Sequence, residues 1–541
     1  MVVQSNFGGR LPNIPSVLTF ERETKMWLHD NRLAENFNGQ LLFATCLMML
    51  SQINFGMDLA AFSNTQAMDA FTEKFGSLNP KTGKYHIDPY FLSLLNSLTY
   101  IGQVFGVVTG GFINRRYGRR PAFFVMTGWA ILAAVLLVSA QHKEQILAGR
   151  IVNYIYLGQE LVTIPVMQAE IVPPKIRGMV VGTYQLGVMI GAFIMASITY
   201  GTAKIDGEAS FRIPLGLFFI IPLIVGGCAF FLSESPRWLL VRDRHEEALT
   251  ALRRYRRGKF TEEEITAEYH EQIAMIKAMT NEKGTFKEMW QGINLKRSFI
   301  VLGSNICIQI SGQGLSSKYG TIFIKDIHGP DPFQMFLINT GIQIAVVLVA
   351  MYLLDKTGRK PLLIIGSFVQ TATMFIMGGL GTISEPSKGI KIGITAMLSL
   401  NYFGFVFGWA PIYHIISAEI PNSRMRDMTY TVCSIATVAT QFVVSFSIPY
   451  LLYAPYANLG TKIGLVFGPI AFCTLLFAIF VIPECRSFSL EEIDHLFRER
   501  VPLLKFQKYK HGHILPDEVV HVSMQKLGEG PSVEERENVA P

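Results

Sequence analysis

Charged residues are scarce in this 541-residue chain: Asp, Glu, Lys and Arg make up 16% of it, whereas soluble domains carry about 25%. No glycine-rich phosphate loop, metal-ligand cluster or activated nucleophile is visible, so the sequence predicts no enzyme, no cofactor and no bound metal. The six cysteines are scattered and lack the spacing of a zinc site or a disulfide framework. The first 38 residues are polar and mixed in charge, unlike a cleavable signal peptide.

Apolar runs are abundant instead, and apolar residues make up 50% of the chain. Each run is about 20 residues long, which lets a helix cross a hydrocarbon core about 30 Å thick. We predict spans near residues 41–62, 91–113, 121–140, 146–168, 179–200, 213–232, 298–322, 333–354, 361–381, 391–418, 428–453 and 463–482. The expected fold class is an all-α membrane protein of twelve transmembrane helices in a lipid bilayer.

A polar, Lys- and Arg-rich stretch over 233–297 separates the sixth span from the seventh. Its periodicity predicts short amphipathic helices, for example over 246–255 and 261–275. The expected organisation is an N-terminal segment (1–40), a first six-helix bundle (41–232), linker helices (233–297), a second six-helix bundle (298–482) and a C-terminal tail (483–541).

Positive residues gather in alternate loops, which sets the expected orientation. The loops after the second, fourth, eighth and tenth spans carry the excess, namely Arg115, Arg116, Arg119, Arg120, Lys175, Arg177, Lys356, Arg359, Lys360, Arg424 and Arg426. In the other loops Lys and Arg are offset by Asp and Glu. By the positive-inside rule, both termini and the linker are expected in the cytoplasm. Because the basic residues belong to these loops, the net charge of +7 does not predict a nucleic-acid partner.

A loop motif occurs twice. Asn114–Pro121 (NRRYGRRP) follows the second span, and Asp355–Pro361 (DKTGRKP) follows the eighth. The same motif at equivalent places in both halves indicates a duplicated bundle. Such duplication predicts a substrate site near the midplane, where the two halves meet.

Further motifs follow the fourth, sixth, tenth and twelfth spans: Pro165–Pro173 (PVMQAEIVP), Glu234–Leu239 (ESPRWL), Ala418–Pro421 (AEIP), Pro483-Glu484 and Leu490–Ile493 (LEEI). Together with the duplicated loops, they resemble the sugar porter branch of the major facilitator superfamily over about residues 41–494. The resemblance implies the major facilitator fold and a fungal-type sugar/H⁺ symporter that works by alternating access. It also implies a small sugar or sugar-like substrate.

Two charges lie inside predicted spans, Asp58 in the first and Arg150 in the fourth. Each ion costs about 2.5–3.5 kcal/mol at a helix centre, so pairing or a wet cavity is expected. The resemblance implies that they form an ion pair that couples transport to a proton. A static structural ion pair is the alternative.

The resemblance assigns sugar-hydroxyl binding to Gln185 and Gln309, and less directly to Gln343. Phe405 and Trp409 are candidates for flat apolar walls against a pyranose ring, and His414 stands where the family has a tryptophan. For all six, helix packing or helix–helix hydrogen bonding is the alternative. The chain departs from the family pattern at Ile308, Gly314, Lys318 and Thr437-Val438, so several hydroxyl-binding groups are missing. A disaccharide or glycoside, a polyol or a non-sugar metabolite therefore stays open as an alternative to an ordinary hexose.

Seven charged residues near the expected cytoplasmic face match family positions that form a salt-bridged gate: Arg115, Arg119, Glu170, Glu234, Arg359, Glu419 and Glu484. The resemblance implies that these bridges lock the outward-facing state and break when the cavity opens inward. Anchoring of loops at lipid headgroups is the alternative. Gly102, Gly106 and Gly110 predict a close contact of the second span with another helix.

The function predicted from sequence is secondary active transport, by proton-coupled import across a plasma membrane. Two other functions remain open. One is export of a small secondary metabolite, and the other is nutrient sensing on the same fold.

Overall fold

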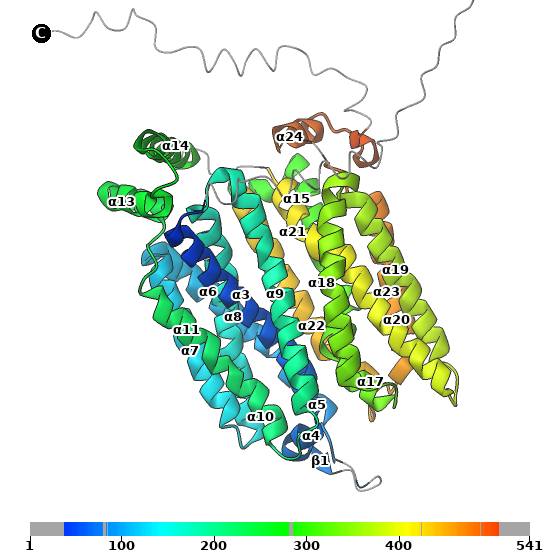
Figure 1. Cartoon of the computed structure of the whole chain (residues 1–541). Helices are drawn as coiled ribbons and strands as arrows, with labels where there is room; N and C mark the ends of the chain where they lie inside the picture. Colours follow the sequence, from blue (N-terminus) through cyan, green and yellow to red (C-terminus); the bar gives the residue numbers. More distant parts are fainter. Residues whose placement is uncertain are drawn as a thin grey trace, which may run out of the picture.

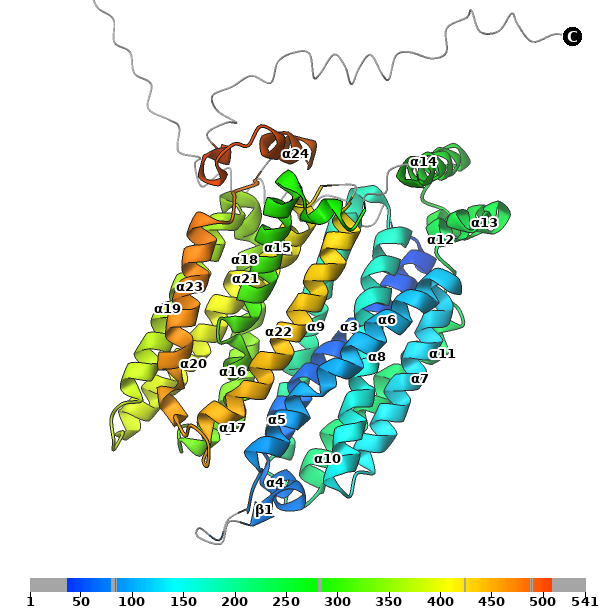
Figure 2. The same cartoon turned by 180° about the vertical axis from the view of Figure 1, so that it is seen from behind.

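The structure is a computed structural model that describes residues 37–78, 83, 85–280, 285–422, 425–486, 488 and 490–507. Of the predicted N-terminal segment (1–40), residues 1–36 lie outside the described residues, as does the tail beyond Gln507. Two helical bundles stand side by side, with short helices across one end (Figures 1 and 2). We call this end, which carries α12, α13, α14 and α24, the linker face. The opposite end, which carries α4 and the β1–β2 hairpin, is the hairpin face.

The first bundle contains the first six spans, and a short helix and a hairpin follow its first helix. Its elements are α3 (Gly39–Thr65), α4 (Asp69–Phe75), β1 (Ser77–Leu78), β2 (Tyr85–His86), α5 (Pro89–Ser97), α6 (Thr99–Arg116), α7 (Arg119–Val138), α8 (Lys143–Ile171), α9 (Pro174–Thr202), α10 (Ala209–Gly216), η1 (Leu217–Phe219) and α11 (Ile220–Ala229). Strands β1 and β2 pair antiparallel, with Ser77 opposite His86.

The linker folds into α12 (Pro236–Val241), α13 (His245–Arg256), α14 (Glu262–Thr280) and the turn η2 (Glu288–Trp290). Helices α13 and α14 confirm the two amphipathic helices predicted there. In α13, Ala248, Ala251, Leu252 and Tyr255 are buried, while the charged residues around them are mostly exposed.

The second bundle contains the remaining spans and ends in helices on the linker face. Its elements are α15 (Gly292–Ile310), α16 (Gln313–Lys318), α17 (Gly320–Asp326), α18 (Pro332–Thr357), α19 (Arg359–Leu380), α20 (Lys388–Phe407), α21 (Trp409–Glu419), α22 (Arg426–Leu452), η4 (Gly460–Ile463), α23 (Gly464–Phe480), α24 (Leu490–Arg498) and η5 (Leu503–Lys505). Between the bundles, α5 packs on α22 and α9 packs on α18.

Helix starts follow local chemistry. The Asn38 side chain accepts a hydrogen bond from the Leu41 N–H and caps α3, and Asp331 caps α18 in the same way. Such caps satisfy backbone donors that have no partner within the helix.

The seventh span is broken: α15 ends before Gly312, whose φ of +87° lies in the left-handed region that glycine adopts readily. The break turns α16 and α17 toward the first bundle at the hairpin face.

Ten helical segments of the described chain are long and apolar enough to span a membrane. The other two predicted spans fall short for identifiable reasons. Helix α8 carries Arg150 and Glu160 within its length, and the seventh span is divided at Gly312. The arrangement is that of the twelve-helix major facilitator fold, as predicted.

The close helix contact predicted from the glycines of the second span is confirmed. A Cβ atom on Gly102 or Gly106 would collide with the carbonyl oxygens of Ile151 and Ile155 on α8. Helices α6 and α8 can therefore pack with their backbones almost in contact.

Candidate functional site

A cavity of about 190 Å³ lies between the two bundles. The first bundle contributes residues of α3, α5, α8 and α9 to its wall, and the second contributes residues of α16, α17, α18, α20 and α22. The polar side chains of its wall are Ser63, Asn96, Arg150, Tyr154, Gln313, Ser316, Ser317, Lys318, Thr321, Asn339, Thr340, Gln343, Ser399, Tyr402 and Gln441. Such a wall, with both apolar and polar groups, suits a small hydroxylated solute.

Hydrogen bonds between the bundles close the cavity toward the hairpin face. The Lys318 carbonyl oxygen accepts from Gln66 Nε2 at 2.7 Å and from Ser63 Oγ at 3.3 Å. Ser63 Oγ also donates to the Ser317 carbonyl, and Thr321 Oγ1 donates to Asn64 Oδ1 at 2.9 Å. We call these contacts the hairpin-face seal.

Asp58 and Arg150 lie in neighbouring helices of the first bundle, yet they do not form an ion pair in this conformation. Asp58 is 3% exposed, and its Oδ1 accepts a hydrogen bond from Asn153 Nδ2 at 3.0 Å. The Arg150 guanidinium donates to the Leu95 carbonyl at 3.4 Å and lies 3.7 Å from the centre of the Phe62 ring. Sequence reasoning missed Asn153, although it lies three residues after Arg150 and so on the same face of α8.

Lys318, noted in the sequence only as a departure from the family pattern, lines the cavity. Its Nζ lies 3.3 Å from Ser445 Oγ and 4.1 Å from the centre of the Tyr100 ring. A lysine within an apolar span is itself a signal, because such charges normally face a bundle interior or a wet cavity.

Among the three glutamines expected to bind substrate, Gln343 lines the cavity and is 3% exposed. Gln309 lies behind the wall, where its Oε1 accepts from Nε2 of the lining residue Gln313 at 3.1 Å. Gln185 is half-buried on α9, one turn closer to the linker face than the lining residue Val188. It lies on the cavity side of α9, because residues three apart share a helix face.

The three aromatic candidates lie elsewhere in this conformation. Phe405 is outside the wall but stacks on the lining ring of Tyr402, with centroids 5.9 Å apart. Trp409 is fully buried in the core of the second bundle, directly after the break of the tenth span at Gly408. His414 hydrogen-bonds Tyr430 at 3.1 Å, away from the cavity. The structure therefore brings neither Trp409 nor His414 to the site.

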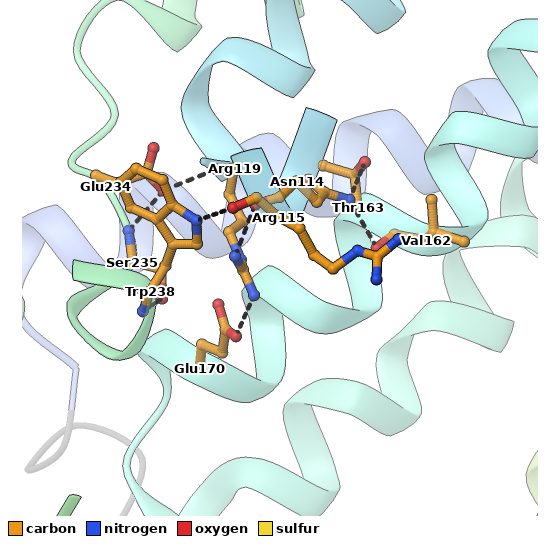
Figure 3. Close-up of polar contacts among 9 residues, drawn as sticks. All are labelled: Asn114, Arg115, Arg119, Val162, Thr163, Glu170, Glu234, Ser235 and Trp238. Carbon is orange, nitrogen blue, oxygen red and sulfur yellow. Dashed lines mark hydrogen bonds and ion pairs between the residues drawn. The ribbon is translucent and has the colours of Figure 1, made fainter. Parts of the chain in front are cut away.

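At the linker face, the gate residues of the first bundle surround the N-terminus of α7 (Figure 3). Arg119 Nη2 pairs with Glu170 Oε1 at 2.6 Å. Glu234 accepts from the backbone N–H groups of Arg119 and Arg120 at 2.9 and 3.0 Å. Burial raises the pKa of Glu234 above its usual value, although the N–H groups around it oppose the shift. Arg115 contributes its carbonyl oxygen, to Trp238 Nε1, rather than a salt bridge among the described residues.

The second bundle repeats this arrangement at the N-terminus of α19. Arg359 Nη2 pairs with Glu419 Oε1 at 2.7 Å. Glu484 accepts from the N–H groups of Arg359 and Lys360 at 3.2 and 2.8 Å. Carboxylates at helix N-termini satisfy free N–H groups and the helix dipole. All these pairs stay within their own half of the molecule in this conformation, and the gate that locks the outward-facing state stays a prediction.

Comparison with known proteins agrees with this architecture. The family model described as "Sugar (and other) transporter" matches residues 43–497. A hexose transporter of Saccharomyces cerevisiae is 26% identical over 80% of this chain and 78% of its own length. A high-affinity glucose transporter of Kluyveromyces lactis is 27% identical over 86% of each chain. An inward-open structure of the xylose transporter of E. coli covers 84% of this chain and 99% of its own, with a TM-score of 0.70 and 21% identity. This chain is a multi-pass membrane protein that belongs to the family of sugar (and other) transporters.

Proposed function

We propose that this protein carries a sugar or sugar-like solute across a membrane by alternating access, as a proton-coupled importer of the plasma membrane. The cavity between the two bundles, with walls from both, is the observation that carries the proposal. A solute bound there contacts both bundles, so rocking of one bundle against the other changes the face to which it is exposed. Relatives described as hexose and glucose transporters support a sugar as the solute.

The Lys and Arg bias of the loops supports a cytoplasmic linker face. With that orientation, the hairpin-face seal closes the extracellular side, and the structure corresponds to an inward-facing state. Alternating access requires that, in an inward-facing state, the two bundles are held together at the extracellular end. The hairpin-face seal provides such hydrogen bonds.

Proton coupling would use Asp58. Its carboxyl group is buried in the first bundle near the cavity and has one hydrogen-bond donor, Asn153. Loss of its charge on protonation removes a nearby counter-charge for Arg150, which lines the cavity. Protonation of Asp58 would then change the electrostatic potential at the wall that binds the solute. A change in solute affinity caused by proton binding is a coupling free energy between the two sites.

The linker-face gate would close in the outward-facing state. Arg119 with Glu170 and Glu234, and Arg359 with Glu419 and Glu484, form two similar charged clusters at the ends of opposing bundles. We expect them to meet when the bundles close at this face.

Counterflow in proteoliposomes tests the proposal. We expect labelled glucose, xylose, a disaccharide, a polyol or a sugar acid to exchange against an internal pool, and an inward proton gradient to drive its accumulation. Exchange without gradient-driven accumulation would leave transport standing and overturn proton coupling. Accumulation driven by an outward gradient would favour the exporter, and absence of exchange with all solutes would overturn transport and favour a sensor.

A further inference from the structure

The cavity has an unusual charge balance for a site that binds a neutral sugar. Arg150 and Lys318 are the charged side chains of its wall among the described residues, and both are cations. Arg150 comes from the first bundle and Lys318 from the second. No carboxylate belongs to the described wall, so a ligand in the cavity meets positive charge from both sides.

Each of the two cations lies against one of a pair of contacting aromatic rings. Lys318 Nζ lies 4.1 Å from the centre of the Tyr100 ring, and the Arg150 guanidinium lies 5.2 Å from the centre of the Tyr154 ring. The two tyrosines contact edge to face, with centroids 5.9 Å apart. The hydrogen-bond partners of the cations are neutral: the Ser445 hydroxyl for Lys318 and the Leu95 carbonyl for Arg150.

Asp58 does not neutralise both cations. Its Oδ1 is bound by Asn153, and it forms no ion pair with Arg150 or Lys318 in the described structure. Glu160, the other buried acid of this bundle, accepts a hydrogen bond from the Tyr184 hydroxyl at 2.9 Å and lies outside the wall. The positive charge at the wall therefore has no carboxylate partner within the described wall. A single carboxylate on the solute would balance it, whereas a phosphate monoester brings a charge of about −1.5 to −2 and would overcompensate.

The rest of the wall suits hydroxyl groups. The side-chain amides of Gln343 and Gln441 line the cavity and make no hydrogen bond to the described protein. Each amide offers two donors and an acceptor. Gln343 is 3% exposed, so its amide group finds a partner only in a cavity water or a ligand.

We propose that the solute is a polyhydroxylated monocarboxylate, a sugar acid of the aldonate or uronate class, whose carboxylate lies between Lys318 and Arg150. Its hydroxyl groups bind Gln343 and Gln441. Charge-assisted hydrogen bonds to both cations give the acid its advantage over the neutral sugar with the same carbon skeleton. This substrate class rests on the proposed transport function, because it concerns the same cavity.

Competition experiments with the wild-type protein test the substrate class first. Glucose, gluconate and glucuronate are compared as competitors of counterflow and as stabilisers against thermal unfolding of the purified protein. We expect an acid to act at a concentration at least about ten times lower than glucose. If glucose exchanges or stabilises and neither acid does so, the substrate class is wrong and sugar transport stands. If no solute exchanges or stabilises, both proposals are overturned.

A matched pair of lysine variants then tests the position of the carboxylate. Lys318→Met removes one of the two cations of the described cavity wall. Lys204→Met removes an exposed lysine that also lies 4.1 Å from a tyrosine ring centre, that of Tyr200, outside the cavity. We expect Lys318→Met to reduce the preference for acid over glucose about tenfold and Lys204→Met to preserve it.

An unchanged preference in Lys318→Met would remove Lys318 from the site and overturn the proposal. If that variant does not fold, Lys318→Arg replaces it. Arg retains the charge but binds carboxylates with a planar, two-pronged geometry. Preserved acid preference in Lys318→Arg supports the proposal, and loss of the preference in a folded Lys318→Arg that still exchanges glucose contradicts it.

Discussion

Single buried charges define this molecule at the scale of the residue. Asp58 and Arg150 are buried within membrane-spanning segments, and Lys318 lies in the cavity wall on another, at about 2.5–3.5 kcal/mol each on insertion scales. Each has polar or aromatic neighbours that reduce this cost: Asn153 for Asp58, Phe62 for Arg150 and Tyr100 for Lys318.

The proposed role of Asp58 in proton coupling can be tested separately from solute binding. In Asp58→Asn the side chain keeps its shape and a hydrogen-bond acceptor for Asn153 but cannot gain or lose a proton. We expect counterflow to persist, while accumulation driven by a proton gradient falls to the equilibrium ratio of about one. Uptake into proteoliposomes with and without a pH gradient measures both.

Asp206→Asn is the control, because Asp206 is exposed in the loop before α10. It should leave accumulation and counterflow unchanged. Undiminished accumulation in Asp58→Asn would exclude Asp58 as the proton carrier.

At the scale of the element, helices α6 and α8 depend on close backbone contact. Gly106 faces the carbonyl oxygen of Ile155, whereas Gly111 on the same helix has no atom within 4 Å of the position of an added Cβ. Alanine favours a helix over glycine by about 1 kcal/mol. At Gly106 this gain is opposed by overpacking, which typically costs about 1–3 kcal/mol.

We therefore expect Gly106→Ala to lower the unfolding temperature of the purified protein and Gly111→Ala to leave it equal or higher. Thermal unfolding followed by tryptophan fluorescence in one detergent measures both variants. If Gly106→Ala is as stable as Gly111→Ala, the two helices can separate at little cost, and the close contact does not hold the bundle together.

The elements themselves could largely be predicted from sequence. Apolar runs gave the spans to within a few residues of the helices, and the duplicated loops gave their division into two halves. The sites within them were harder to predict. Trp409 directly follows the break at Gly408 and is buried in the core, and Gln309 hydrogen-bonds the lining residue Gln313 without lining the cavity itself. Such tertiary positions are not encoded in a short motif.

The family resemblance predicts residue positions well where a motif fixes the backbone geometry. It predicts them less well where tertiary contacts determine which side chains line the cavity. Glu234 and Glu484 bind two equivalent helix N-termini, and both lie in the motifs that follow the sixth and twelfth spans; their role as a gate stays a prediction. Lys318 was read as a missing hydroxyl-binding group, because the chain alone does not show that its side chain lines the same cavity as Arg150.

At the scale of the whole molecule, the two ends of the bundle pair have different contacts. The hairpin-face seal joins the bundles, while the charged clusters of the linker face stay within their own bundles. Variants at the two ends should therefore shift the conformational equilibrium in opposite directions.

Gln66→Ala removes the hydrogen bonds of Gln66 to the Lys318 carbonyl and to Asn96. Only the bond to Lys318 crosses the bundle interface, and at about 1 kcal/mol for it we expect a shift toward the outward-facing state of about fivefold. Glu419→Gln weakens the linker-face cluster that we expect to close in that state, and should shift the population inward. Labelling of a cysteine at Ala60 in the cavity wall, from the hairpin face and in a cysteine-free background, measures both.

Gln141→Ala serves as the control, because Gln141 lies at the hairpin face but bonds Lys74 within the first bundle. It should label at the wild-type rate. Equal labelling of all variants would mean that neither the seal nor the gate sets the population.

Lys318 takes part in both the hairpin-face seal and the cavity wall. Its carbonyl oxygen is held by Gln66 and Ser63 across the bundle interface, while its ammonium group lies in the cavity. When the outer side opens, those donors must leave, and the short helix that carries the ammonium group moves with its carbonyl. In the proposed transport cycle, a solute that binds this side chain therefore stabilises the closed hairpin face, and an empty cavity allows that face to open.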